Sequence, residues 1–424
     1  MPQRYLSSIA TSAALVVLVV AGTGLRGQPP GAGRWVTAWG ASQHALGTNA
    51  ITNATARLVA RVTIPGDAVR IRLDNTFGAA PVSIGRAYVG SRVQGAALAA
   101  GSNRQALFGG AASVTIPPGR SVVSDSVAMK VAAWQDLAVS LYIPATGVTA
   151  SQHSGAVVTS YVSANGSGDV AADEARSPFT TTTTSMLWLK AVDVLSTTAA
   201  GAIIAFGDSI TDGTCATLDA HDRWEDWLAV RLQLDAAPRG AAGRLKAVVN
   251  EGIGGNTVTK EHLEPPVASP PGIERLDRDV FSHQGVTDVI LFMGTNDIRR
   301  GASASQVMGG IADIVRRVKA NSLRIAGVTI IPRHNVQATA DNSGWNAGKT
   351  AIRHEVNQWI RAKAGFDAVI DFDKVVRDPA NPDLMYPPFN CGDGIHPSPL
   401  GYYAMGNSLA LDLFSGGPRA TSRP

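Results

Sequence analysis

A serine in the segment 205–213 follows a glycine turn, and its position is typical of a nucleophile. The apolar run 202–206 leads into Gly207, Asp208 and Ser209, and a segment of helical composition, 223–234, follows. A strand, a tight turn and a helix lift one side chain to the carboxyl edge of a parallel sheet. A hydroxyl held there beside backbone N–H groups can attack a carbonyl carbon. On this segment alone a second interpretation stays open, in which Ser209 only caps the helix.

Three later glycine-containing turns follow predicted strands and carry groups that complement such a serine. The run 251–257 frees backbone N–H groups to approach a substrate oxygen, and its glycine spacing does not fit a dinucleotide site. In 294–297, Asn296 can donate its amide to an oxyanion, although an Asx turn is the alternative. Asp393 precedes His396 by three residues near the end of the chain. His396 can then take the serine proton while Asp393 fixes the imidazole tautomer.

Taken together, these four blocks resemble the SGNH (GDSL-type) hydrolase superfamily. They occur in the family's order, and the resemblance covers the segment 202–410. It implies that Ser209 is the nucleophile, that His396 is the general base and then the general acid, and that Asp393 orients His396. The Gly-x-Ser-x-Gly pentapeptide of the α/β-hydrolase elbow is absent, because Thr211 stands at its second glycine.

The same resemblance implies an oxyanion hole made by the backbone N–H groups of Ser209 and Gly255 together with the Asn296 side chain. Gly254 is the other candidate for the glycine donor. Gly255 is preferred because it directly precedes the polar Asn256.

The activity implied by the resemblance is that of a serine esterase, which cleaves carboxylic esters through an acyl-enzyme and acts on short acyl groups. Three alternatives stay open: a carbohydrate esterase that deacetylates plant or microbial polysaccharide, a lipase or lysophospholipase, and a non-catalytic carbohydrate-binding protein. The expected partner is therefore a small-molecule or polysaccharide ester. The sequence does not predict the oligomeric state.

No cofactor and no metal are expected. The metalloprotease motif His-Glu-x-x-His is absent, because 353–357 spells Arg-His-Glu-Val-Asn, and two cysteines make no thiolate cluster. Asp208 and Asp297 are expected to brace the turns beside them rather than to react. His221 is close enough to Ser209 in sequence to line the pocket, whereas surface or packing roles are the default for the other histidines.

The second half of the chain alternates between strand-like and helix-like segments. Strands are predicted at 202–206, 246–250, 286–293, 324–331 and 368–372, and helices at 223–234, 273–281, 304–320, 349–363 and 400–413. Five strands joined by helical crossovers indicate an α/β fold, a three-layer doubly wound parallel sheet of the flavodoxin-like kind. We predict that the catalytic domain spans 200–414 and that 415–424 is a disordered tail.

The first half, 34–195, is predicted to be a β-rich accessory domain. Short apolar runs separated by Gly/Pro turns suggest strands at 56–64, 69–73, 82–89, 112–116, 122–131, 137–143 and 186–194, with a polar exposed loop at 171–185. Such spacing favours a β-sandwich or jelly roll. The segments 35–39, 75–78 and 124–125 resemble secreted bacterial GDSL-type esterases with an N-terminal β domain. Sugar binding and a purely packing role are both open for this domain.

The N-terminus has the pattern of a secretory signal peptide. Arg4 precedes an apolar stretch, 9–21, and small residues follow, so we predict a signal peptide at 1–27 and a secreted or periplasmic protein without a stable membrane anchor. An uncleaved anchor is the alternative. Net charge is only +4 and no dense Lys/Arg run occurs, which argues against nucleic-acid binding.

The chain has two cysteines, Cys215 and Cys391, and each lies close in sequence to one of the four blocks. A pair of cysteines in an exported protein favours a disulfide, which would tie the serine turn to the histidine turn. Two free buried thiols are the competing interpretation.

Overall fold

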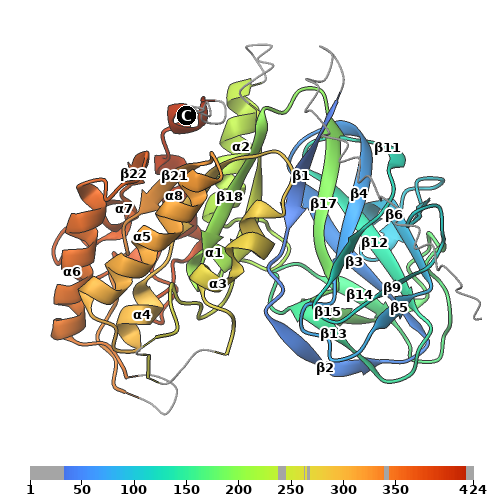
Figure 1. The fold of residues 1–424 in the computed structure, drawn as a ribbon, viewed down its shortest axis with the longest axis horizontal. Coiled ribbons are helices and arrows are strands. Elements are labelled where there is room, and N and C mark those ends of the chain that lie inside the picture. Colours follow the sequence, from blue (N-terminus) through green and yellow to red (C-terminus); the bar gives the residue numbers. More distant parts are fainter. Residues whose placement is uncertain (1–32, 237–244, 262, 265–267, 339–342, 417–424) are drawn as a thin grey trace, which may run out of the picture. The chain divides into compact units, whose positions relative to one another are not determined.

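In the computed structural model, five parallel strands form the sheet predicted from the second half of the sequence (Figure 1). Their order is β19-β18-β20-β21-β22, so the first strand of the series lies between the second and the third. This is the doubly wound order in which ligands bind beyond the carboxyl ends of the strands. Each strand begins within one residue of its predicted start: β18 (Gly201–Gly207), β19 (Lys246–Gly252), β20 (Val286–Phe292), β21 (Arg324–Val328) and β22 (Ala368–Ile370).

Helices cover both faces of this sheet, because successive strand residues point to opposite sides. Ile203 and Ala205 of β18 pack in a core with α2, α7 and α8, whereas Ile204 and Phe206 pack in a core with α3, α5 and α6. The helices are α1 (Ser209–Asp212), α2 (Trp224–Ala236), α3 (Gly272–Leu276), α4 (Thr295–Arg299), α5 (Ala304–Ala320), α6 (Ala347–Arg361), α7 (Phe372–Val376) and α8 (Pro399–Ser408).

Two helices differ from their predictions. The segment predicted as one helix at 273–281 is α3 followed by a π-helical turn, η2 (Asp277–Phe281). The helix predicted at 400–413 ends at Ser408 and resumes as a short 3-10 turn, η4 (Leu411–Phe414). The break follows from a contact that the sequence pattern does not contain: Arg231 Nη1 donates to the carbonyl oxygens of Gly406 and Leu409, at 2.9 and 2.6 Å. A second 3-10 turn, η3 (Pro387–Phe389), precedes the Asp393 turn.

The region before β18 consists mostly of β-strands, as predicted. The larger sheets are β1-β17-β4-β10 with β11 on β4, and β15-β14-β3-β12-β6-β7 with β8 on β6; β16-β13-β2 and β5-β9 are smaller. The strands are β1 (Arg34–Gly40), β2 (Ala45–Ile51), β3 (Ala54–Val62), β4 (Gly66–Asp74), β5 (Val82–Ile84), β6 (Arg86–Gln94), β7 (Ala97–Leu98), β8 (Arg104–Ala106), β9 (Val114–Ile116), β10 (Ser121–Val123), β11 (Val127–Val131), β12 (Gln135–Ile143), β13 (Val148–His153), β14 (Ser160–Ser163), β15 (Phe179–Thr183), β16 (Met186–Leu187) and β17 (Leu189–Ser196).

Four predictions in this β region are wrong. The strand predicted at 82–89 is divided at Gly85 into β5, which pairs with β9, and β6, which pairs with β12. The strand predicted at 186–194 is divided at Trp188 into β16, which pairs with β13, and β17, which pairs with β1 and β4. The single strand predicted at 122–131 is divided into β10 and β11, because the Ser124 hydroxyl accepts from the Ile71 N–H and the Asp125 N–H turns to the Leu107 carbonyl. The polar loop predicted at 171–185 contains strand β15, which pairs with β14. Its threonines are β-branched and suit an exposed edge strand despite their polarity.

The structure describes residues 33–236, 245–261, 263–264, 268–338 and 343–416. The predicted signal peptide and most of the predicted tail lie outside these residues. The described residues from Gly33 onward form one compact unit, and the core of the β region continues into one face of the parallel sheet. None of the helices in the described ranges has the length and apolar character needed to cross a membrane.

Candidate active site

Ser209 stands where the sequence predicted, directly beyond the carboxyl end of β18. Asp208 is the N-cap of α1, with its carboxylate accepting from the Ile210 N–H at 3.0 Å. The hypothesis that Ser209 only caps the helix is therefore wrong: Ser209 is the first helical residue, and Asp208 provides the cap. A Cβ at Gly207 would lie 2.1 Å from Thr211 Oγ1, so the tight entry to this turn requires glycine.

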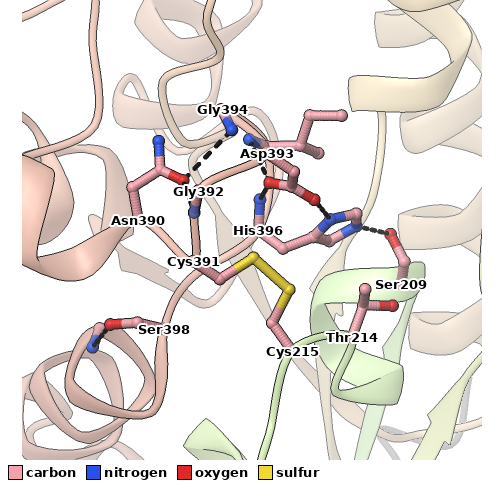
Figure 2. The surroundings of a disulfide bond; sticks show 12 residues. Ser209, Thr214, Cys215, Asn390, Cys391, Gly392, Asp393, Gly394, His396 and Ser398 are labelled. Carbon is pink, nitrogen blue, oxygen red and sulfur yellow. Dashed lines mark hydrogen bonds and ion pairs between the residues drawn. A yellow bond between two sulfur atoms is a disulfide. The ribbon is translucent and has the colours of Figure 1, made fainter.

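The hydroxyl of Ser209 meets the predicted histidine, although 187 residues separate them in sequence. Ser209 Oγ lies 2.8 Å from His396 Nε2, and His396 Nδ1 lies 2.5 Å from Asp393 Oδ2 (Figure 2). The other carboxylate oxygen, Asp393 Oδ1, accepts the backbone N–H groups of Ile395 and His396, each at 2.8 Å. With Nδ1 donating to the carboxylate, Nε2 of a neutral imidazole is left to accept the serine proton.

The surroundings of Asp393 favour its ionised form. Partial burial alone would raise the pKa of Asp393, but hydrogen bonds from the His396 ring and backbone lower it to about 2. Burial raises the pKa of Asp208 to about 6. Arg333, 2% exposed, acts on both carboxylates, and burial lowers its pKa to about 10, so it remains a cation at neutral pH. Arg333 was not predicted from the sequence.

The glycine turn after β19 lies against the serine turn. The Ile253 N–H donates to the Gly207 carbonyl at 3.3 Å, and the Gly254 N–H donates to Asp212 Oδ2 at 2.9 Å. Gly255 has φ +71°, a conformation that favours glycine, and its N–H has no acceptor among the described residues. Of the two glycines considered, Gly255 is thus the one whose N–H remains available to a substrate.

The Gly294 turn approaches the same glycine turn from β20. Asn296 Nδ2 donates to the Asn256 carbonyl at 3.0 Å, which uses one of its two amide hydrogens. The Asp297 carboxylate accepts the Val258 N–H at 3.0 Å and the Thr259 N–H at 3.2 Å, and burial raises its pKa to about 7. These contacts fit the bracing role expected for Asp297, which makes no contact with His396.

The predicted disulfide is present and joins the two turns. Cys215 bonds to Cys391 over a sequence separation of 176, and the two sulfurs and an Asp393 carboxylate oxygen all lie within 4.8 Å of one another (Figure 2). The Cys391 N–H also donates to the His396 carbonyl at 3.1 Å. Because both sulfurs are in the disulfide, they offer no thiolate to a metal ion.

Reduction of this disulfide is expected to lower the free energy of unfolding by up to about 5 kcal/mol, because it frees a very long closed loop in the unfolded chain. Denaturant unfolding of the oxidised protein should be compared with that of the reduced protein and of the Cys215→Ser/Cys391→Ser double variant. The reduced protein and the double variant should agree. Equal stability of the oxidised and reduced forms would contradict the prediction.

One buried residue behind the site, Arg275, was not predicted from the sequence. Arg275 of α3, fully buried, donates to the carbonyls of Gly207 and Glu251 at 2.8 Å each and to Asn256 Oδ1 at 3.0 Å. His221, considered as a pocket residue, instead lines a small cavity behind α1, and burial lowers its pKa. A buried arginine inside a helix carries no local sequence signal for such a role.

Comparisons with known proteins give a family match for the second half of the chain. Residues 205–404 match the model of the GDSL-like lipase/acylhydrolase family. No curated protein sequence matches the chain. Similar solved structures include a carbohydrate acetylesterase family member from Sinorhizobium meliloti (19% identity, 49% of this chain and 94% of that chain, TM-score 0.38), a member of the lipolytic G-D-S-L family from Veillonella parvula DSM 2008 (21%, 50% and 97%, 0.33) and a GDSL-like lipase from Bacteroides thetaiotaomicron VPI-5482 (18%, 49% and 85%, 0.33).

Proposed function

Because residues 205–404 belong to the GDSL-like lipase/acylhydrolase family, within the SGNH hydrolase superfamily, we propose that the protein is an exported serine esterase that uses Ser209, His396 and Asp393. Lipases and acylhydrolases cleave ester bonds, so membership of this family indicates that the protein is an ester hydrolase. The observation that carries the proposed mechanism is the line of hydrogen bonds from Ser209 Oγ to His396 Nε2 and from His396 Nδ1 to Asp393. Export is supported by the disulfide, since such bonds persist in oxidising compartments.

The reaction proceeds in two acyl transfers. Ser209 Oγ attacks the ester carbonyl as His396 Nε2 takes its proton, and the imidazolium then protonates the departing alcohol oxygen. Water attacks the acyl-serine with His396 again as base, which releases the acid and restores the serine. Asp393 remains ionised throughout and stabilises the imidazolium that forms in each half-reaction.

The oxyanion of each tetrahedral intermediate is held by the N–H groups of Ser209 and Gly255 and by the second amide hydrogen of Asn296. Three observations support this assignment. The Gly254 N–H is already bonded to Asp212, the Gly255 N–H has no acceptor in the part of the chain that the structure describes, and Asn296 is fixed through its other hydrogen to the Asn256 carbonyl.

The Asn296→Ala variant is expected to lose on the order of 10²–10³ in kcat, with KM little changed, because it removes one donor to the oxyanion. The measurement is steady-state kinetics on p-nitrophenyl acetate. Asn256→Ala is not a suitable control, because its side chain braces Arg275. Asn321→Ala, at the exposed end of α5, is suitable and should retain wild-type kinetics. A wild-type kcat for Asn296→Ala would exclude Asn296 from the oxyanion hole.

Short acyl esters are the proposed substrates. We expect turnover to fall from p-nitrophenyl acetate to octanoate. The β region is proposed to be a sandwich of the jelly-roll kind that supports the catalytic domain, which is consistent with its two larger antiparallel sheets.

Covalent labelling tests the proposal directly. A fluorophosphonate should modify Ser209 alone, as located by mass spectrometry, and should abolish turnover of p-nitrophenyl acetate in proportion to labelling. Acetylated xylan and a phospholipid, assayed beside the aryl esters, separate a polysaccharide deacetylase and a lipase from a small-ester esterase. Absence of both labelling and turnover in the folded protein would refute a serine esterase and favour a binding protein.

A further inference from the structure

Two residues of the β region reach the turns of the proposed active site from behind. His153 is the last residue of β13, and Ser42 lies between β1 and β2. They are 4% and 0% exposed, and both lie outside the 205–404 match. We propose that His153 is a positioning residue for the oxyanion hole, acting through Asp212 on the Gly254 turn. This inference rests on the proposed esterase function.

One carboxylate connects His153 to the glycine turn. Asp212 Oδ1 lies 3.0 Å from His153 Nε2, while Asp212 Oδ2 accepts the Gly254 N–H at 2.9 Å. Asp212 is also the last residue of α1, the helix that Ser209 begins. A Cβ at Gly252 would lie 2.2 Å from the Asp212 nitrogen, so α1 and the glycine turn are in direct backbone contact. A shift of Asp212 would therefore displace the donor turn relative to the nucleophile.

The surroundings of His153 require both ring nitrogens to donate. Nδ1 lies 2.8 Å from the Ser42 carbonyl oxygen, which can only accept, and Nε2 faces the Asp212 carboxylate. An imidazolium meets both demands, whereas a neutral ring meets one. Burial alone would lower the pKa of His153, but the charge and the hydrogen bond of Asp212 raise it.

Other charged groups near His153 come from several elements. Glu251 of β19 favours the charged ring. The His44 ring packs edge-on at 5.2 Å, and burial lowers the pKa of His44 to about 4, so His44 is neutral at physiological pH. His153 lines a small cavity whose other titratable side chains are Arg61, Asp212, His221 and Arg223. The positive charges of Arg275 and Arg278, from α3 and η2, also lower the pKa of His44.

The direction in which the pKa of His153 is shifted determines how its contact with Asp212 depends on pH. The folded protein binds the His153 proton more tightly than the unfolded chain does. The stabilisation is therefore complete below the unfolded pKa, about 6.5, and is lost as pH rises through the raised folded pKa. On the alkaline side the neutral ring keeps one N–H and gives up one of its two bonds, which loosens Asp212 and the Gly254 turn.

The same part of the β region also braces Asn296, the side-chain donor of the proposed oxyanion hole. Ser42 Oγ donates to Glu251 Oε2 at 2.5 Å and accepts from Arg275 Nη1 at 3.0 Å. Arg275 Nε donates to Asn256 Oδ1, and the Asn256 carbonyl accepts from Asn296 Nδ2, each at 3.0 Å. Both proposed oxyanion donors beyond Ser209 are thus backed by hydrogen bonds that begin in the β region.

The test compares His153→Ala and His153→Gln with His44→Gln, a neighbouring histidine whose ring Nε2 bonds to Ser154 Oγ and which makes no hydrogen bond to Asp212 or to the Gly254 turn among the described residues. Steady-state kinetics on p-nitrophenyl acetate are measured from pH 5 to 10, with the fraction of folded sites counted by fluorophosphonate labelling. For His153→Ala we expect kcat per labelled site to fall about 10- to 100-fold with KM little changed, because misplacement by about 1 Å costs this much. His153→Gln should recover part of the loss and lack the alkaline limb. His44→Gln should match the wild type.

Wild-type kcat per labelled site and an unchanged pH profile in His153→Ala would overturn the proposal. So would a loss accounted for entirely by fewer labelled sites, since His153 would then only stabilise the fold. If His153→Ala does not fold, the Asp212→Asn variant tests the proposal instead. The asparagine keeps an oxygen that can accept the Gly254 N–H but removes the negative charge beside His153. The fall of kcat at alkaline pH should then disappear; if it stays, the His153–Asp212 pair does not affect catalysis and the proposal is wrong. An inactive, unlabelled wild type would instead refute the proposed function itself.

Discussion

The Ser209→Ala variant is expected to lower kcat on p-nitrophenyl acetate on the order of 10⁶-fold, the scale of losing the nucleophile of a serine hydrolase. The reason is chemical: no other hydroxyl is bonded to His396 among the described residues, so His396 has no nucleophile to deprotonate. The substitution removes one oxygen from a side chain that stays slightly exposed, so thermal unfolding should change little. Single-turnover kinetics should also show no acyl-enzyme burst.

Ser305→Ala is the matched control, because Ser305 is an exposed helical serine whose hydroxyl, among the described residues, is hydrogen-bonded to Ser303 alone. It should keep full activity and full labelling by fluorophosphonate. Turnover by Ser209→Ala near the wild-type rate would assign the nucleophile to another residue. Activity that disappears together with the folded state would show only a structural effect, and the unfolding measurement distinguishes the two.

The Asp393→Asn variant is expected to lower kcat about 10⁴-fold while leaving the fold intact. Asparagine would present an NH₂ group to His396 Nδ1, which moves the ring proton to Nε2 and leaves no acceptor for the serine proton. The turn itself should survive, because the remaining amide oxygen can still accept the Ile395 and His396 N–H groups. Kinetics from pH 5 to 9 are the measurement.

The pKa of Asp393, about 2, adds a second expectation. Since this carboxyl is ionised across the whole assay range, any fall of wild-type activity between pH 5 and 7 cannot come from Asp393. Its contribution to stability is present above its unfolded pKa, about 3.9, and is lost only as pH falls toward 2.

The control for Asp393→Asn is Asp378→Asn, because the Asp378 carboxylate also accepts a backbone N–H in a nearby turn. Near-wild-type kcat in Asp393→Asn would remove Asp393 from the mechanism.

The sequence predicted the parts of the site that lie at strand ends. Periodic apolar runs located each strand of the parallel sheet, and a polar residue just beyond a strand has few places to go except the carboxyl edge. Ser209 and Asn296 were proposed as site residues in this way, whereas His396 was proposed because Asp393 precedes it by three residues. The disulfide followed from the positions of two cysteines beside two of these turns.

The supporting residues could not be predicted, because each depends on a contact between distant segments. His153 lies at the end of a short strand, and Arg275 lies in a segment that the sequence predicted only to be helical. The fully buried group that includes Lys190, Glu251 and Asp279 is spread over β17, β19 and η2. Such ion pairs form only after all the elements that carry them have assembled, so no local sequence pattern predicts them. The prediction of edge strand β15 failed for a similar reason, because the strand that it pairs with is a separate segment of the chain.

The separation of Ser209 from His396 by 187 residues has a consequence for the newly made chain. At typical synthesis rates the histidine is made roughly 10 to 40 s after the serine. For that interval the hydroxyl has no base, and the turns that would hold an oxyanion are only partly present. If the proposed mechanism holds, we expect the growing polypeptide to be inactive toward esters and to gain activity only when the His396 turn folds against the end of β18.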